Sequence, residues 1–238
     1  MANWISHLII TDKLYTMGLD LNERGFAIGN IAPDCNVENK NWTQFTPSRE
    51  VTHWMSGETK LTADYEGFYD KYIKDKNLFS DEHKAFLWGY YSHLVTDVEF
   101  QRFVRNEERI KNTYLRIKQD DEMCIKIENF PENLDTLKTV FGRNNVLNDI
   151  VTQEINYLKA TPHSRYNTII KKTHDFPDYI EYLPKGAIVR KIGVMAKEDM
   201  SMKDKEKYIF FTQEEFNKFL ENTSGLIYKL LHDKNYTA

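Results

Sequence analysis

Helical periodicity runs through the first two thirds of the chain and constrains the fold more than any other feature. Apolar residues recur three and four positions apart, and the few glycines stand between the periodic segments. The clearest segment begins at Ser80, a capping residue followed by Asp81 and Glu82 in the first turn, and continues to Phe103. The sequence therefore predicts an all-α, multi-helix bundle.

Further helices are expected wherever the same spacing recurs. Thr212 and Glu215 form a capping box that opens the last helix, and Ser48 can cap a short one. Besides the segment from Ser80, the pattern predicts helices at residues 4–20, 49–55, 61–76, about 145–159 and after 212.

Turn-forming residues interrupt this pattern in three places. We expect Gly25 and Gly29 to end the first helical segment. Residues 29–36 are rich in turn formers and are expected to form a loop that presents Asp34. Residues 187–192 lie among prolines and glycines, which predicts a short strand or an extended connector rather than a helix.

The length of 238 residues suits one large domain or one domain with an appendage. We expect a helical domain over residues 1–180, and over 181–238 a less regular C-terminal extension with a final helix that packs on it. The net charge is -4, with Lys and Arg scattered among acidic residues, so a dedicated duplex nucleic-acid partner is not expected. The oligomeric state is left open.

The N-terminal residues and the cysteines indicate the cellular compartment in which the protein is expected. The first ten residues lack a basic start and a long apolar run, and no segment approaches the ~18 apolar residues of a membrane span. Cys35 and Cys124 are far apart, which fits a reducing compartment and excludes a cysteine-only zinc site. We therefore expect a cytoplasmic protein without a transmembrane segment.

His93 and Asp97 are four residues apart on the clearest predicted helix, so both side chains project from one face. An imidazole and a carboxylate in this arrangement can hold one metal ion. Their surroundings are aromatic and apolar, and a buried Asp97 needs a counter-charge such as a metal. The alternative is a solvated or mutually hydrogen-bonded pair.

Three more potential ligands lie upstream on separate elements: His7, Asp34 and His53. Each of them alone can equally be an ordinary core or surface residue. Their order along the chain gives them more weight. The pieces that carry this order are Ser6-His7-Leu8-Ile9, Gly29-Asn30-Ile31-Ala32-Pro33-Asp34, Thr52-His53-Trp54 and the Gly-Tyr-x-x-His-x-x-x-Asp segment at residues 89–97.

Taken together, these motifs resemble the zinc-dependent phospholipase C family, whose fold is shared by S1/P1-type nucleases. The resemblance implies an α-helical hydrolase that cleaves a phosphodiester with a cluster of up to three zinc ions. It further implies that Asp34, His53, His93 and Asp97 hold one zinc ion, and that His7 and a bridging Asp97 help to hold another.

The sequence departs from the family pattern at further ligand positions. Secreted members use an N-terminal tryptophan as a ligand, whereas Trp4 follows three other residues. Position 103 is Phe where the pattern has a histidine, and no His-x-x-x-Glu occurs downstream, although His163 or His174 could substitute. We therefore expect one or two zinc ions, and iron or manganese would suit the same ligands.

The predicted function is a metal-dependent hydrolase of phosphate esters, most simply a phosphodiesterase. Asp34 is the candidate catalytic residue that orients or deprotonates water, and Arg49 or Lys60 could stabilise charge. The expected substrate is a small phosphoester or a phospholipid head group. One alternative is a non-catalytic binding or scaffold protein stapled by metal. Another, an HD-type phosphohydrolase, would require the pair His174-Asp175.

Overall fold

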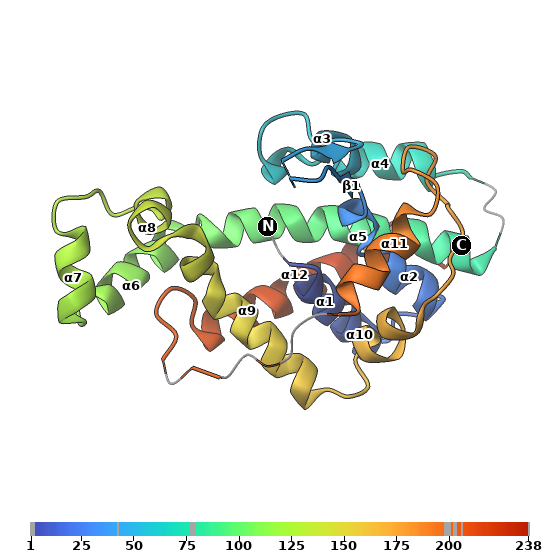
Figure 1. Ribbon diagram of the computed structural model, residues 1–238. Helices are drawn as coiled ribbons and strands as arrows, with labels where there is room; N and C mark the ends of the chain where they lie inside the picture. The colour runs from blue at the N-terminus through green and yellow to red at the C-terminus, as the bar shows by residue number, and fades with distance from the viewer. Residues whose placement is uncertain are drawn as a thin grey trace.

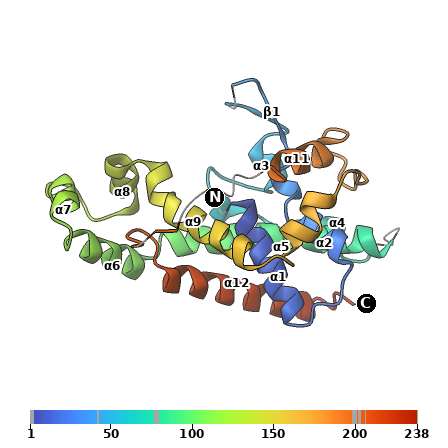
Figure 2. The same cartoon turned by 60° about the horizontal axis from the view of Figure 1, so that its bottom comes forward.

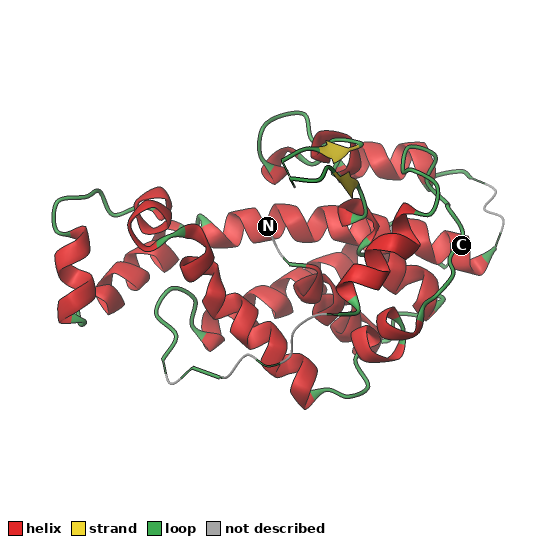
Figure 3. Cartoon of the chain, in the orientation of Figure 1, coloured by secondary structure: helices red, strands yellow, loops and turns green. Residues whose placement is uncertain are grey.

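The structure, a computed structural model, describes residues 3–41, 43–76, 80–197, 201, 204–205 and 207–237. Within these residues helices dominate, and two short antiparallel strands accompany them (Figure 3). The elements are α1 (Trp4–Thr16), α2 (Glu23–Gly29), η1 (Ala32–Asp34), β1 (Val37–Glu38), β2 (Phe45–Thr46), α3 (Arg49–Thr52), η2 (Lys60–Thr62), α4 (Tyr65–Tyr72), α5 (Asp81–Val104), α6 (Glu107–Ile117), α7 (Asp121–Ile127), α8 (Leu134–Phe141), α9 (Arg143–Ala160), α10 (Arg165–Thr168), η3 (Ile170–Lys172), α11 (Ala187–Met195) and α12 (Gln213–Asp233). The prediction of an all-α fold is confirmed.

The long helix α5 crosses the molecule and organises the helices around it (Figure 1). Helices α1, α2 and α4 and the 3-10 turn η2 pack along it or close to it, and α12 contacts both α1 and α5 (Figure 2). Helices α6, α7 and α8 extend beyond one end of this group. Most of the central helix is therefore buried, including the turn that carries His93 and Asp97.

Local capping explains where the two longest helices begin. Ser80 accepts a hydrogen bond from the backbone N–H of His83 at 3.1 Å, and α5 continues with two acidic residues in its first turn. At α12, Thr212 and Glu215 exchange the reciprocal bonds of a capping box. Both predicted helix starts are confirmed.

Glycines have a different role from the one expected from the sequence. Gly25 and Gly29 do not end the first helix. They belong to a second helix, α2, which ends at Gly29 and was not predicted as a separate helix. A Cβ atom at Gly29 would overlap the backbone carbonyl of Phe86, and one at Gly89 on α5 would overlap the carbonyl of Phe26. These glycines therefore allow the backbones of α2 and α5 to touch.

The predicted connector at residues 187–192 is wrong, because this segment belongs to helix α11. Ile188, Ile192 and Met195 are fully buried at a spacing of four and three, which is one apolar face of a helix. Gly186 precedes the helix with φ of 75°, and a Cβ atom at Gly193, within the helix, would meet no atom within 4 Å. Burial of the apolar face outweighed the glycine and proline signals.

Other boundaries shifted for local reasons. The first helix ends at Thr16 rather than at Asp20, and Gly18 follows with φ of 95°. Residues 61–76 divide into η2 and α4, because the Asp64 side chain accepts a bond from Gly67 N at 2.8 Å and starts a new helix. Helices α6, α7 and α8 were not predicted from the sequence.

The C-terminal part shares its core with the rest of the chain. Apolar residues of α11 and α12 join those of α1 and α5 in one buried cluster. The domain division at residue 180 stays a prediction. Within the described residues, no helix is both long and apolar enough to cross a membrane.

A buried carboxylate on α9 holds the segment that precedes α12. Asp149 accepts hydrogen bonds from the backbone N–H groups of Phe210 at 2.7 Å and Phe211 at 3.2 Å, and Lys205 Nζ lies 2.6 Å from it. We expect Asp149→Ala to lower the free energy of unfolding by about 3 kcal/mol, because two buried donors lose their acceptor.

Denaturant titration of wild type and of Asp149→Ala measures this loss in the free energy of unfolding. Asp135→Ala is the matched control, since the Asp135 side chain is 92% exposed and its ion pair with Lys138 spans 3.6 Å. The control should change the free energy of unfolding by less than ~0.5 kcal/mol. Equal losses in the two variants would contradict the role assigned to Asp149.

Candidate metal centre

Five side chains from four parts of the fold meet beside α5. His7 comes from α1, Asp34 from η1, His53 from the residue that ends α3, and His93 and Asp97 from α5. The structure thus brings together the five residues that the resemblance assigned as ligands. His7, His53, His93 and Asp97 are fully buried, whereas the Asp34 side chain is 17% exposed.

The ligand atoms form two overlapping triads. One comprises His7, His93 and Asp97, the other Asp34, His53 and His93, and within each triad the candidate ligand atoms lie within 4.8 Å of one another. His93 Nε2 lies 3.2 Å from Asp97 Oδ2, and His53 Nε2 lies 3.2 Å from Asp34 Oδ1. His93 belongs to both triads and is therefore their shared member.

The His7 and His93 rings stack face to face, with centroids 3.8 Å apart and planes within 3°. Burial and the neighbouring His93 lower the pKa of His7 well below its ordinary value. Burial and the Lys60 ammonium lower the pKa of His53 in the same direction. His7 and His53 are therefore neutral at neutral pH, which is the form that binds metals.

The protein fixes the orientation of two of the imidazoles through their Nδ1 atoms. His93 Nδ1 lies 2.8 Å from the carbonyl oxygen of Asn30, and His53 Nδ1 lies 3.1 Å from that of Arg49. His53 Nδ1 also lies 2.9 Å from the hydroxyl oxygen of Thr52, which can donate to it, so that the Nε2–H of His53 donates to Asp34. His93 Nδ1–H can donate to its carbonyl, which leaves the Nε2 lone pair of His93 directed into the cluster. This is the usual outer arrangement of a metal-binding histidine.

Asn30 links the helices that carry the ligands, and its role was not inferred from the sequence. Its Nδ2 donates to the backbone oxygen of His7 at 2.9 Å and to Thr11 Oγ1 at 2.8 Å, while its carbonyl accepts from His93. The only available signal was its place beside Gly29 in the Gly-Asn-Ile-Ala-Pro-Asp motif.

Lys60 is the buried cation of the cluster. Only 6% of its side chain is exposed, its Nζ contacts Asp97 Oδ2, and it lies 3.9 Å from Asp34 Oδ1. Burial alone would raise the pKa of both carboxyls, but the Lys60 ammonium, with neighbouring histidines, holds the pKa of Asp34 and of Asp97 well below the usual range. Both carboxylates are therefore ionised.

The donor set fits a metal ion. Among the residues that the structure describes, several buried polar atoms lack a hydrogen-bond partner, and four of them belong to this cluster: His7 Nδ1, His7 Nε2, His93 Nε2 and Asp97 Oδ1. Leaving such atoms unpaired costs free energy, which a bound cation would recover. Imidazole nitrogens with carboxylate oxygens suit zinc, iron or manganese.

Other sequence candidates do not join the cluster. His163 and His174 are exposed and belong to neither triad. Phe103 stacks on Phe219 at 5.0 Å, so aromatic packing occupies the position where the family pattern has a histidine. Glu154 on α9 is buried, but it accepts bonds from the backbone N–H and hydroxyl of Ser6.

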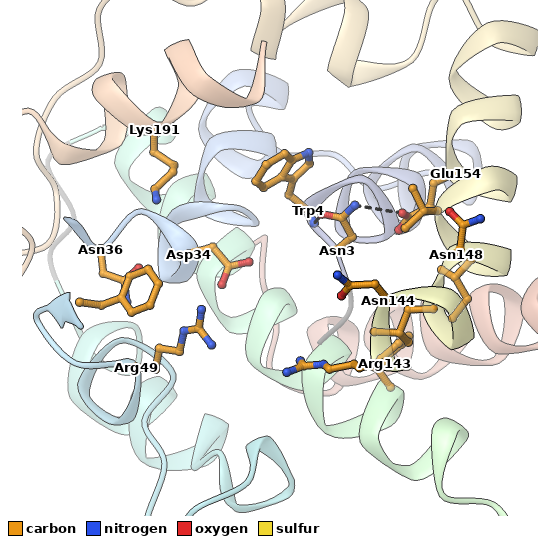
Figure 4. Close-up of a pocket in the computed structure, with 15 residues that line it drawn as sticks. Asn3, Trp4, Asp34, Asn36, Arg49, Arg143, Asn144, Asn148, Glu154 and Lys191 are labelled. Atoms are coloured by element: carbon orange, nitrogen blue, oxygen red, sulfur yellow. Dashed lines mark hydrogen bonds between the residues drawn. The ribbon is translucent and has the colours of Figure 1, made fainter. Parts of the chain in front are cut away.

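A cleft of about 480 Å³ leads to this cluster of candidate ligands (Figure 4). Asp34 forms part of its wall, so the one partly exposed ligand connects the buried cluster with the cleft. Its walls are largely apolar and carry charges of both signs. The lining includes Trp4, Phe45, Phe100, Leu147, Ile150 and Val151, the cations Arg49, Arg143 and Lys191, and the carboxylates Asp34 and Glu154. Lys191 is paired with Glu38 at 2.9 Å, and Arg49 packs over Phe45.

A family model described as zinc dependent phospholipase C matches residues 4–99 of the chain. Residues 4–99 are thus similar to zinc-dependent phospholipases C. This similarity confirms the resemblance seen in the sequence. The matched segment begins with α1, ends within α5 and contains all five candidate ligands. No curated protein and no solved structure matches the chain.

Proposed function

We propose that this protein is a metal-dependent phosphodiesterase in which His7, Asp34, His53, His93 and Asp97 form a zinc-binding centre. The observation that carries this proposal is the set of buried nitrogen and oxygen atoms on His7, His93 and Asp97 that lack a hydrogen-bond partner in the described part of the chain, beside a cleft that contains arginines. The family relationship of residues 4–99 supports metal-dependent phosphodiester cleavage.

When bound, zinc would polarise the phosphoryl oxygen and lower the pKa of a coordinated water. Asp34, at the border between the cluster and the cleft, accepts a hydrogen bond from the attacking water and orients it. Because the pKa of its carboxyl is held well below the usual range, Asp34 remains ionised and keeps this acceptor.

The cleft supports an anionic substrate with an apolar portion. The guanidinium groups of Arg49 and Arg143 face the space in front of Asp34 (Figure 4), where they can bind the non-reacting phosphate oxygens. Trp4, Phe45 and Phe100 provide apolar wall. A small phosphoester or a phospholipid head group fits this combination. The predicted cytoplasmic location and the lack of a nucleic-acid partner stay predictions.

Hydrolysis of bis(p-nitrophenyl) phosphate by protein without a histidine tag, with elemental analysis of the same sample, tests the proposal. We expect bound zinc, turnover that a chelator abolishes, and recovery when zinc is added back. Metal without turnover on a panel of phosphodiesters and phospholipids would favour the metal-stapled scaffold. Absence of metal, even after supplementation, would contradict both functions.

Asp34→Asn should reduce kcat for phosphodiester hydrolysis by at least ~100-fold, because the amide cannot provide the ionised acceptor at the cleft. Asp175→Asn is the matched control, since the Asp175 side chain is 97% exposed. The control should keep its turnover. Loss of activity in Asp175→Asn with retention in Asp34→Asn would instead favour an HD-type phosphohydrolase that uses the pair His174-Asp175.

A further inference from the structure

Lys60 divides the cluster into two unequal halves. Asp97 Oδ2 contacts the Lys60 ammonium and lies 3.5 Å from His53 Nε2. His93 Nε2 lies 3.2 Å from the same oxygen, at the boundary between the two halves. Asp97 Oδ1 faces the other way, 3.9 Å from His7 Nε2, and has no hydrogen-bond partner among the described residues. The two oxygens of one carboxylate therefore meet different environments.

The half that contains Lys60 is already satisfied. His53 Nε2 and Asp34 Oδ1 lie 3.2 Å apart and form a hydrogen bond, and Lys60 Nζ contacts Asp97 Oδ2 from within the same group. The half that contains His7 holds the unpartnered atoms: both nitrogens of His7, Nε2 of His93 and Oδ1 of Asp97. The need for a cation is thus concentrated on the His7 side.

We propose that Lys60 acts as a built-in cation for Asp34 and Asp97, so that the centre binds a single divalent metal at His7, His93 and Asp97 Oδ1. This inference rests on the proposed metal centre and specifies its composition. A metal held by Asp34 and Asp97 would need to approach their oxygens to about 2.0–2.2 Å. The Lys60 ammonium occupies that side of Asp97.

Charge balance supports a single ion. Two ionised carboxylates and one ammonium leave the protein groups with one net negative charge. One divalent ion would bring the buried cluster to a single positive charge, whereas a second would leave a strongly positive interior without compensating anions. Lys60 therefore replaces one metal ion electrostatically, without coordination chemistry of its own.

Metal stoichiometry distinguishes the two halves. We expect chelator-treated protein to take up one zinc ion per chain in isothermal titration calorimetry. His7→Ala should abolish this binding, and His53→Ala should retain it, because His53 belongs only to the half that Lys60 satisfies. Two ions per chain, or loss of binding in His53→Ala with retention in His7→Ala, would overturn the inference.

Lys60→Met removes the ammonium but keeps most of the side-chain length. In this variant we expect a second zinc ion to bind, and the metal-free form to melt at a lower temperature than metal-free wild type. Lys74→Met is the matched control, since the Lys74 side chain is 54% exposed and pairs only with Asp70 at the surface in the part described. The control should bind one ion and melt as wild type.

The outcomes separate this inference from the proposed function. One zinc ion in Lys60→Met, with unchanged melting of its metal-free form, would overturn the role of Lys60 and leave the metal centre intact. No zinc binding by wild type would overturn the metal centre itself. If Lys60→Met does not fold, the stoichiometries of wild type, His7→Ala and His53→Ala still decide the inference.

Discussion

Protein carrying His93→Ala should contain almost no bound metal and show at least ~1,000-fold lower phosphodiesterase turnover. His93 is shared by both ligand triads, so its loss disables either arrangement of the ion. Loss of a metal ion that supplies several kcal/mol of transition-state stabilisation accounts for a change of this size.

The same substitution should lower the free energy of unfolding by about 3–5 kcal/mol. It removes a fully buried ring that stacks on His7, it leaves the Asn30 carbonyl without its donor, and it takes one imidazole away from Asp97, which keeps Lys60. Elemental analysis and denaturant titration measure the two effects. Exposed His174→Ala is the control and should match wild type in both. Unchanged metal content in His93→Ala would contradict the proposed centre.

Gly29→Ala should produce the second large effect, a loss of about 3 kcal/mol or more in the free energy of unfolding. The added methyl group would overlap the Phe86 backbone, and a backbone cannot rotate away as a flexible side chain can. Separation of α2 from α5 would also displace Asn30, whose carbonyl holds His93. We therefore expect weaker zinc binding as well.

Gly225→Ala is the matched control for this substitution. Gly225 lies inside α12, and a Cβ atom there would meet no atom within 4 Å. Alanine has the higher helix propensity, so this variant should gain up to ~1 kcal/mol of stability. Equal effects of the two substitutions, measured by thermal and denaturant unfolding, would show that α2 and α5 do not depend on close backbone contact.

Local sequence patterns predicted the parts of the protein that depend on neighbouring residues. The capping signals at Ser80 and at Thr212 with Glu215 begin helices in the structure, since their bonds lie within one turn. The same holds for the pair His93 and Asp97, because a spacing of four on a helix places both on one face.

The predictions that were wrong concern segments whose structure depends on contacts with distant parts of the chain. Glycine and proline signals around residues 187–192 indicated a connector, yet burial of Ile188 and Ile192 stabilises α11. Gly25 and Gly29 were expected to break a helix, yet they allow α2 to lie against α5. In both cases tertiary packing outweighed the local preference.

The sequence by itself determined the helical class, the family relationship of residues 4–99 and the identity of five candidate ligands, because each depends on short-range spacing or on ordered motifs. Only the tertiary structure decided how these ligands face one another. His7 stacks on His93, which lies 86 positions further along the sequence. Lys60 contacts Asp97, which lies 37 positions further along. Such contacts arise when helices pack, and no periodicity along the chain encodes them.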